Sequence, residues 1–215
     1  VDRMRRWLEI MLHPDGEISF FNDASMGISP APELIMDYTE RLGISGSPIK
    51  DETIHLEDSG YIRVERQNMI AFLDVAQVGP DYLPAHAHAD TLSFEMSLFG
   101  QRVFVNSGTS CYGRGEERRQ ERATSAHNTV EINGENSSEV WGGFRVGRRA
   151  YPTEPEIREN GDRTVISASH DGYKWLPTKN HHYRSWSFAF SSVLIEDRIT
   201  GDFQKAVAYF QLHPN

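Results

Sequence analysis

The feature that most constrains the fold of this chain is a change in hydrophobic period near residue 60. Before it, apolar residues recur at helical spacing; after it, they alternate along short segments separated by Gly, Asn and Asp. Alternation sends successive side chains to opposite faces, so it predicts β-strands with one buried face. Many short strands with turn residues between them are typical of a sandwich. We therefore predict a mainly β protein, a large antiparallel β-sandwich behind a short N-terminal helical segment.

Two helices are predicted at the N-terminal end. Apolar residues from Met4 to Met11 follow helical spacing, and the turn residues His13-Pro-Asp-Gly16 end that helix. A second helix is predicted from about residue 32 to 42, because Pro32 stands near its start and Gly43 follows its end.

The rest of the chain predicts strands. Asn133-Gly134 is a strong hairpin-turn signal, and the clearest alternation is in residues 186–190. The predicted strands are 62–64, 69–73, 91–99, 103–105, 129–132, 164–168, 186–190 and 206–212.

Composition limits the classes of partner. A formal net charge of -9 opposes nucleic-acid binding, whose footprint is a basic excess. No apolar run approaches the length of a membrane span, so no membrane partner is expected. A single cysteine, Cys111, excludes an intrachain disulfide and a Cys-x-x-Cys metal site.

The candidate site begins at His86-Ala-His88-Ala-Asp90, directly before the predicted strand 91–99. Residues at i and i+2 of a strand share a face, so His86 and His88 are predicted to face one cavity. Asn106 and His127 follow in later strand-and-turn units.

Zinc takes imidazole nitrogen and oxygen ligands, which makes His88, Asn106 and His127 candidate metal ligands. Asn106 offers only a neutral carbonyl oxygen, which balances a divalent charge less well than Asp. The alternative is that both histidines are ordinary hydrogen-bonded residues at a sheet edge.

Tyr112 lies in a predicted loop between strands. Its phenol could transfer a proton if nearby cations, such as Arg122 or a protonated His86, lower its pKa from about 10. The alternative is a packed tyrosine whose hydroxyl is satisfied by a hydrogen bond.

Three blocks of the sequence, with support from shorter segments, resemble the heparinase II/III-like polysaccharide lyases. The blocks are Ala85-His-Ala-His-Ala-Asp90-Thr-Leu-Ser-Phe94, Val103-Phe-Val-Asn106-Ser-Gly-Thr109 and Arg122-Ala-Thr-Ser-Ala-His127-Asn-Thr129-Val130. The shorter segments are His13-Pro-Asp-Gly16, Phe21-Asn-Asp23, Ser169-His-Asp-Gly-Tyr173, Arg184 and Leu212-His-Pro214, so the resemblance covers nearly the whole chain.

The resemblance implies a domain organisation. Members of the family join an α/α toroid to an antiparallel β-sandwich, with the active site between them. Residues 1–50 are then the end of the toroid domain, and residues 51–215 are a β-sandwich domain that is truncated at its C-terminal end. The expected partners are the missing N-terminal toroid domain and an acidic polysaccharide substrate; a homodimer is left open. A periplasmic or secreted location is also implied.

The resemblance also implies roles for residues. It places zinc ligands at His88, Asn106 and His127, a catalytic-site histidine at His86 and an active-site tyrosine at Tyr112. The family cleaves uronic-acid-containing polysaccharides by β-elimination, and we expect His86 and Arg122 to help neutralise or orient the uronate. The family's toroid supplies the principal tyrosine and an Asn or His that meets the uronate. These lie outside this sequence, so activity of the chain by itself is left open.

Two other functions are kept as alternatives to the lyase. The chain could be a non-catalytic carbohydrate-binding or structural β domain. His-x-His on a strand also occurs in cupin-like metal enzymes, but Glu95 and Gly100 match the cupin pattern only loosely.

Overall fold

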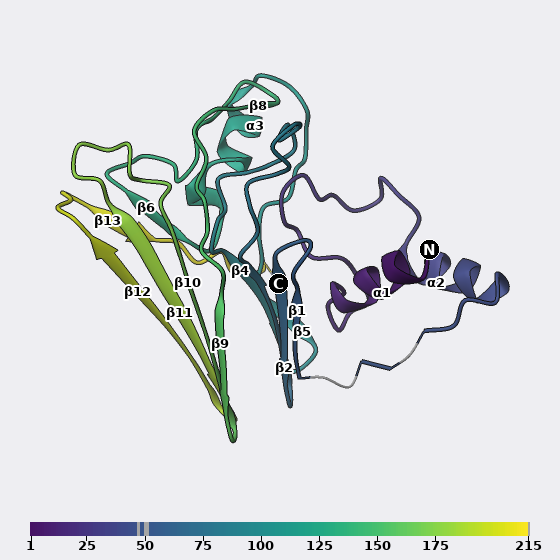
Figure 1. Cartoon of the computed structure of the whole chain (residues 1–215). Helices are drawn as coiled ribbons and strands as arrows, with labels where there is room; N and C mark the ends of the chain where they lie inside the picture. Colours follow the sequence, from purple (N-terminus) through teal and green to yellow (C-terminus); the bar gives the residue numbers. More distant parts are fainter. Residues whose placement is uncertain (47, 50–51, 215) are drawn as a thin grey trace.

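The computed structural model describes residues 1–46, 48–49 and 52–214. Helices α1 (Asp2–Ile10) and α2 (Pro32–Arg41) lie beside the β part, where two main sheets face each other (Figure 1). Every strand pair recorded in these sheets is antiparallel. The expected mainly β, antiparallel sandwich with N-terminal helices is therefore confirmed.

The first sheet is a five-stranded meander in the order β1-β2-β3-β4-β5. The second has four strands in the order β12-β11-β10-β9, and the pairs β13-β6 and β7-β8 are separate. The strand bounds are β1 Thr53–Leu56, β2 Tyr61–Arg66, β3 Met69–Asp74, β4 Phe94–Leu98, β5 Gln101–Phe104, β6 Val130–Ile132, β7 Val140–Trp141, β8 Arg145–Val146, β9 Glu156–Asn160, β10 Arg163–His170, β11 His181–Ala189, β12 Ser192–Thr200 and β13 Ala206–Ala208; the short helices are α3 Glu116–Glu121 and the 3₁₀ turn η1 Thr124–Ala126.

The main core lies between the two sheets. Trp186 and Phe188 of β11 belong to one apolar cluster with Phe94 of β4 and Ile62 of β2, and each is 1% exposed or less. Their alternating neighbours point away from this layer, which is the periodicity that the sequence displays.

Strand β4 departs from the expectation of a half-buried strand over residues 91–99. It covers only Phe94–Leu98, and all residues from Thr91 to Ser97 are buried. The face that carries Glu95 and Ser97 is covered by the chain after α1, where His13 hydrogen-bonds to both side chains. A polar residue in an alternating strand therefore marks a second buried layer here rather than solvent.

The strands that the sequence did not predict are short or lie at sheet edges. β9 (Glu156–Asn160) is largely exposed, and β12 has its polar residues on an edge strand, so neither has a strong apolar pattern. The predicted strand 206–212 is wrong in length, because β13 ends at Ala208. Asn133 and Gly134 both have positive φ and connect the bridged residues Ile132 and Glu135, so the predicted tight turn is present, although the strand that pairs along β6 is β13.

The helices present apolar side chains to solvent. Met4 is 75% and Leu34 59% exposed, and α1, α2 and the β1–β2 turn border an open apolar groove of about 1080 Å³. Among the described residues, no helix combines the length and apolar character needed to span a bilayer.

A directional hydrogen-bond chain ties β10, β11 and β12 together. The Gly172 amide donates to His170 Nδ1, so His170 Nε2–H can donate to His182 Nδ1 (3.1 Å). His182 Nε2–H then donates to Asp197 Oδ1 (2.6 Å), and Arg184 bridges Asp197 to the Leu92 carbonyl. This order satisfies both imidazoles only when they are neutral.

We predict that stability falls as the pH drops below about 6.5. Burial lowers the pKa of His170 and His182 from 6.5, so the unfolded chain takes up protons that the folded chain does not. Each histidine contributes up to about 1.4 kcal/mol per pH unit below 6.5 to this loss. Chemical denaturation at several pH values between about 7 and 5 should show that the free energy of unfolding depends less steeply on pH in His170→Gln than in the wild type. An unchanged slope, or an equal change in the His181→Gln control, would contradict the prediction.

Candidate functional site

The carboxylate of Asp23 is the centre of the polar site. It accepts hydrogen bonds from His86 Nδ1 (2.8 Å), His88 Nε2 (2.8 Å) and the Arg118 guanidinium, whose Nη2 lies 2.8 Å from Oδ2 and whose Nη1 contacts Oδ1. The side chain of Asp23 is only 6% exposed. Residues from the N-terminal segment, a turn before β4 and helix α3 therefore meet at one buried anion.

The sequence Phe21-Asn22-Asp23 explains how this carboxylate is positioned. Phe21 packs on Tyr61, with ring centroids 5.1 Å apart, and anchors the loop in a small apolar cluster. Asn22 adopts a positive φ of 54°, accepts a hydrogen bond from the His88 amide and donates to the Tyr61 hydroxyl. The segment contributes to the family resemblance, but Asp23 was not among the predicted site residues; an acidic residue directly after an aromatic-amide turn was the available signal.

Burial by itself would raise the pKa of the Asp23 carboxyl, but hydrogen bonds from His88, Arg118 and His86 hold that pKa far below its usual range. The carboxylate is therefore charged at neutral pH. A buried anion that accepts from several donors orders each of them in return.

His86 and His88 do not share a strand face, because residues 85–93 form turns and loop rather than a strand. They nevertheless bind the same carboxylate. His88 is fully buried, whereas the His86 side chain is 60% exposed, so the prediction that both face one cavity is wrong. Only His86 lines the neighbouring cavity.

The three predicted metal ligands lie together in a buried position. His88 and His127 have ring centroids 5.2 Å apart, and the Asn106 Oδ1 atom is 3.2 Å from His127 Nδ1. Among the described residues, no group of three His, Cys, Asp or Glu side chains is arranged to hold a metal ion, so any metal here would need the Asn106 amide.

These residues fit a zinc ion on three observations. Asp23 holds His88 Nε2 and leaves His88 Nδ1 buried with no hydrogen-bond partner, the usual arrangement of a metal-bound histidine held by a carboxylate. His127 Nε2 is likewise buried with no hydrogen-bond partner, while His127 Nδ1 donates to Asn106 Oδ1 (3.2 Å), so both imidazoles offer an unpaired nitrogen in this buried place. Burial, and then the adjacent His88, lower the pKa of His127 and keep it neutral, as ligation requires.

Glu95 provides a physical reason for an amide at position 106. Asn106 Nδ2 donates to Glu95 Oε1 (3.2 Å), and the same buried carboxylate accepts from the Phe20 amide and from His13 Nε2 (2.9 Å). An aspartate at position 106 would place two carboxylates at this separation without a proton or cation between them, which is unfavourable.

Arg122 lies beside the site but does not face the cavity. It is 1% exposed and donates to the carbonyls of Ala87 (2.9 Å) and Arg145 (3.3 Å). Burial, with nearby Arg118, lowers the pKa of Arg122 to about 10. In this structure its guanidinium braces the backbone between His86 and His88, so a direct role toward the uronate stays a prediction.

Arg118 is the arginine that reaches the site, and sequence analysis missed it. It is fully buried in α3 and contacts Asp23, while its Nε donates to the Gly143 carbonyl (3.1 Å). The interleaved glutamates made this segment resemble an ordinary charged surface. The available signal was that Arg118 and Arg122 are four residues apart and therefore share one helix face.

Tyr112 lies next to His86, and Phe144 completes a cluster of three rings. The His86 ring centroid is 6.0 Å from that of Tyr112 and 5.9 Å from that of Phe144, and the latter two are 5.2 Å apart. Tyr112 is 56% exposed. The structure thus places Tyr112 and His86 together at the surface, with Arg118 over the Tyr112 ring at 5.3 Å.

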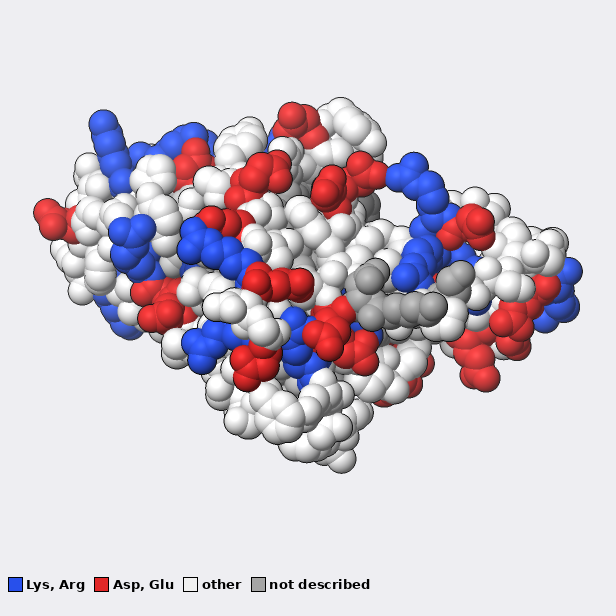
Figure 2. Space-filling model, turned by 60° about the horizontal axis from the view of Figure 1, so that its bottom comes forward, with Lys and Arg blue, Asp and Glu red and all other residues white. Residues whose placement is uncertain are grey.

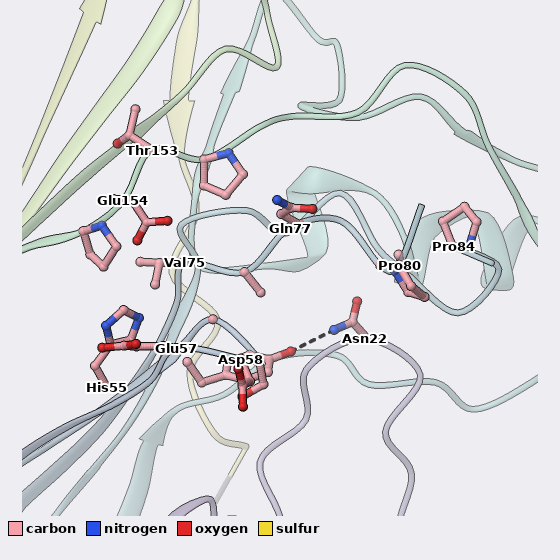
Figure 3. A pocket seen from close by; sticks show the side chains of 18 of the residues that line it. Asn22, His55, Glu57, Asp58, Val75, Gln77, Pro80, Pro84, Thr153 and Glu154 are labelled. Atoms are coloured by element: carbon pink, nitrogen blue, oxygen red, sulfur yellow. Dashed lines mark hydrogen bonds between the residues drawn. The ribbon is translucent and has the colours of Figure 1, made fainter. Parts of the chain in front are cut away.

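An open cavity of about 800 Å³ extends from His86 (Figure 3). It runs between the β1–β2 turn, residues 75–87 and residues 152–155, and Asn22 and Tyr61 form a hydrogen bond at its wall. Glu57, Asp58 and Glu154 give this cavity several carboxylates.

We predict that Asp23→Asn lowers the free energy of unfolding by about 3 kcal/mol, because it removes the anion from a buried guanidinium and two imidazoles. Asp81→Asn is a matched control, since Asp81 pairs with Arg149 but is 77% exposed, and should change stability by less than about 0.5 kcal/mol. Equal effects of the two substitutions in urea denaturation would refute the central role of Asp23.

Comparison with solved structures shows similar folds. The chain matches a heparan sulfate lyase, HepC from Pedobacter heparinus, with a TM-score of 0.76 at 18% identity over 99% of this chain and 34% of that chain. It also matches a heparinase III with a TM-score of 0.70 at 15% identity, covering 93% of this chain and 34% of that one. A further heparinase III matches with a TM-score of 0.67 at 22% identity, covering 93% and 32%.

At these identities the likeness shows the fold, and the chain spans about a third of the length of these structures. A search of curated proteins found no match. The family model described as heparinase II/III-like, C-terminal, matches residues 49–215, most of the chain. The chain therefore belongs to the heparinase II/III-like family, whose C-terminal domain it contains.

Proposed function

We propose that this chain supplies the β half of the active site of a polysaccharide lyase, which cleaves a uronic-acid-containing polysaccharide by β-elimination. The observation that carries the proposal is His86, whose Nδ1 is held by Asp23 while its side chain is exposed at an open cavity. Membership of the family and the lyase folds that the chain resembles support the reaction class and disfavour the cupin-like alternative.

In β-elimination the enzyme removes the proton at C5 of a uronic acid and expels the sugar linked at C4. The developing charge spreads onto a carboxylate that is already negative, so positioned donors and cations must stabilise it. A base takes the C5 proton and an acid protonates the leaving oxygen.

On this proposal, His86 contributes a fixed imidazole to proton transfer or to binding of the uronate. With Nδ1–H donated to the charged Asp23, the free Nε2 carries the lone pair. Tyr112 adds a phenol beside it, and Arg118 a buried positive charge beneath both. Arg122 acts through the backbone that it braces.

A zinc ion is proposed at His88, Asn106 and His127, as a brace of the cleft. When bound, zinc would supply positive charge and cross-link three separate segments of the chain. The chain's own residues then perform the proton transfers, since His88 is buried behind Asp23 and does not reach the cavity.

The charge distribution favours a substrate of modest charge density. The formal net charge is -9, and Lys and Arg are interspersed with Asp and Glu on the face shown in Figure 2, which is turned away from α3 and β8. Binding of a densely sulfated polymer would require a strongly basic surface. A non-sulfated uronate polymer is therefore the proposed substrate, with a helical toroid domain as the proposed partner and a periplasmic or secreted location.

A non-catalytic carbohydrate-binding or structural role is the second candidate. It is favoured by one observation, namely that the chain covers only about a third of the lyase structures. The two functions differ in whether the full-length protein produces an unsaturated uronate.

We predict that His86→Ala in the full-length protein lowers turnover of a uronate polysaccharide by at least about 100-fold. The expected reason is loss of the imidazole that Asp23 orients at the cavity. His181→Ala, at the start of β11, should leave turnover unchanged. Release of unsaturated product measures both, and full activity of His86→Ala would refute the assignment.

We also predict that the purified chain contains zinc, measured by mass spectrometry. His88→Ala and His127→Ala should lose the metal because each removes a ligand, whereas His86→Ala should retain it. Loss with His86 and His88 but retention with His127 would contradict the proposed ligand set. Absence of metal from every form would mean that the Asn106 site does not bind zinc.

A further inference from the structure

We propose that Tyr112 and Phe144 flank a binding subsite for an anionic pyranose ring next to His86, with Arg114 and Arg145 providing its positive charge. The inference rests on the proposed function and deepens it, because it assigns a charge preference to the two sides of His86. Phe144, Arg114 and Arg145 have no part in the elimination proposed above.

A contact between two glycines builds this surface. A Cβ atom at Gly143 would lie 2.5 Å from the Gly113 carbonyl oxygen, so the loop after Tyr112 and the β7–β8 turn touch through their backbones. The Arg118 guanidinium fixes the same turn through its bond to the Gly143 carbonyl. The residues beside these glycines, Tyr112 and Phe144, are therefore held as neighbours.

The two rings are supported on one side and open on the other. Arg118 lies 5.3 Å from the Tyr112 centroid and 5.7 Å from that of Phe144, and it is fully buried. Tyr112 remains 56% and Phe144 43% exposed, which is unusual for aromatic side chains so well fixed from below. An exposed, immobilised aromatic surface matches the apolar C–H face of a pyranose ring, which gains by leaving water there.

Two arginines stand next to the ring residues in the sequence, Arg114 two positions after Tyr112 and Arg145 directly after Phe144, while the α3 carboxylates of Glu117 and Glu121 accept hydrogen bonds from Ser110. Arg114 and Arg145 are exposed, and no carboxylate pairs with either in the part of the chain that the structure describes. The other exposed arginines of this region are paired: Arg119 with Glu116, and Arg148 with Glu139.

The opposite side of His86 is acidic. The cavity there is lined by Glu57, Asp58 and Glu154, all three labelled in Figure 3. Arg114 and Arg145 thus belong to the ring side of His86 and the carboxylates of Glu57 and Glu154 to the cavity side, where Asp58 is paired with Arg3. An extended saccharide that crosses this histidine gains by placing an anionic sugar over Tyr112 and Phe144 and an uncharged sugar in the cavity.

The test is binding of two hexasaccharides to the 215-residue chain. One probe alternates glucuronic acid with N-acetylglucosamine, and the other contains N-acetylglucosamine only. Phe144→Ala should weaken binding of the anionic probe about tenfold, and Phe144→Trp should restore it. Phe190→Ala is the control, because Phe190 is exposed in the β11–β12 turn, at the end of the second sheet away from α3 and β8 (Figure 1).

The charge assignment has its own variants. Arg114→Gln and Arg145→Gln should each weaken binding of the anionic probe several-fold at low salt and leave the neutral probe unchanged. The difference in affinity for the anionic probe between these variants and the wild type should largely vanish at about 0.5 M salt, where exposed charges are screened. Equal effects on both probes, or no difference between Phe144→Ala and Phe190→Ala, would overturn the proposal.

Kinetics of the full-length protein separate this inference from the proposed function. Phe144→Ala should raise KM several-fold with kcat within about twofold of wild type, since the ring binds sugar without touching the reacting atoms. Elimination with unchanged KM in Phe144→Ala would overturn the subsite alone. Selective binding of the anionic probe without any elimination would overturn the lyase function and leave the subsite supported.

Discussion

Two buried carboxylates hold the N-terminal segment against the β-sandwich, and the site depends on both. Asp23, from that segment, accepts donors from His86, His88 and Arg118 of the β part. Glu95, from β4, accepts donors from His13 and the Phe20 amide of the segment. Each side thus contributes an anion to the other's donors. Neither anion can be left unpaired without a cost of several kcal/mol, so the two contacts fix the segment in register with the sheet.

The same two anions are connected through the site. Glu95 accepts from Asn106, whose oxygen lies near His127; the His127 ring packs on His88, and His88 donates to Asp23. His86 is where this buried polar layer meets the open cavity. The orientation of the exposed His86 ring therefore depends on residues as far away in the sequence as His13, 73 positions before it. A substitution at Glu95 is expected to change the position of His86 through these contacts.

The sequence predicted the architecture better than it predicted the site. Alternation of apolar residues located the central strands, because their periodicity reflects the core between the sheets. It failed at β9 and β12, where edge position leaves polar residues on strands, and at Glu95, whose polar face is covered by a distant segment. His88, Asn106 and His127 were brought together as expected. Asp23 and Arg118 were missed because the contacts that join Asp23 to Arg118, His86 and His88 span more than sixty residues, and a division of the chain near residue 50 assigned Asp23 to the other domain.

Asn106 illustrates how such a layer limits substitution at a single position. Its side-chain amide donates a hydrogen bond to Glu95 through Nδ2 and accepts one from His127 Nδ1 through Oδ1. An aspartate would improve the charge balance of a bound zinc ion but would face Glu95 with a second negative charge in a buried place. The more favourable metal ligand is therefore the less favourable partner of Glu95. Because Glu95 also holds His13 and Phe20, the preference for an amide at position 106 arises from attachment of the N-terminal segment, and the weaker charge balance of the proposed zinc site would follow from the way the two parts of the chain are joined.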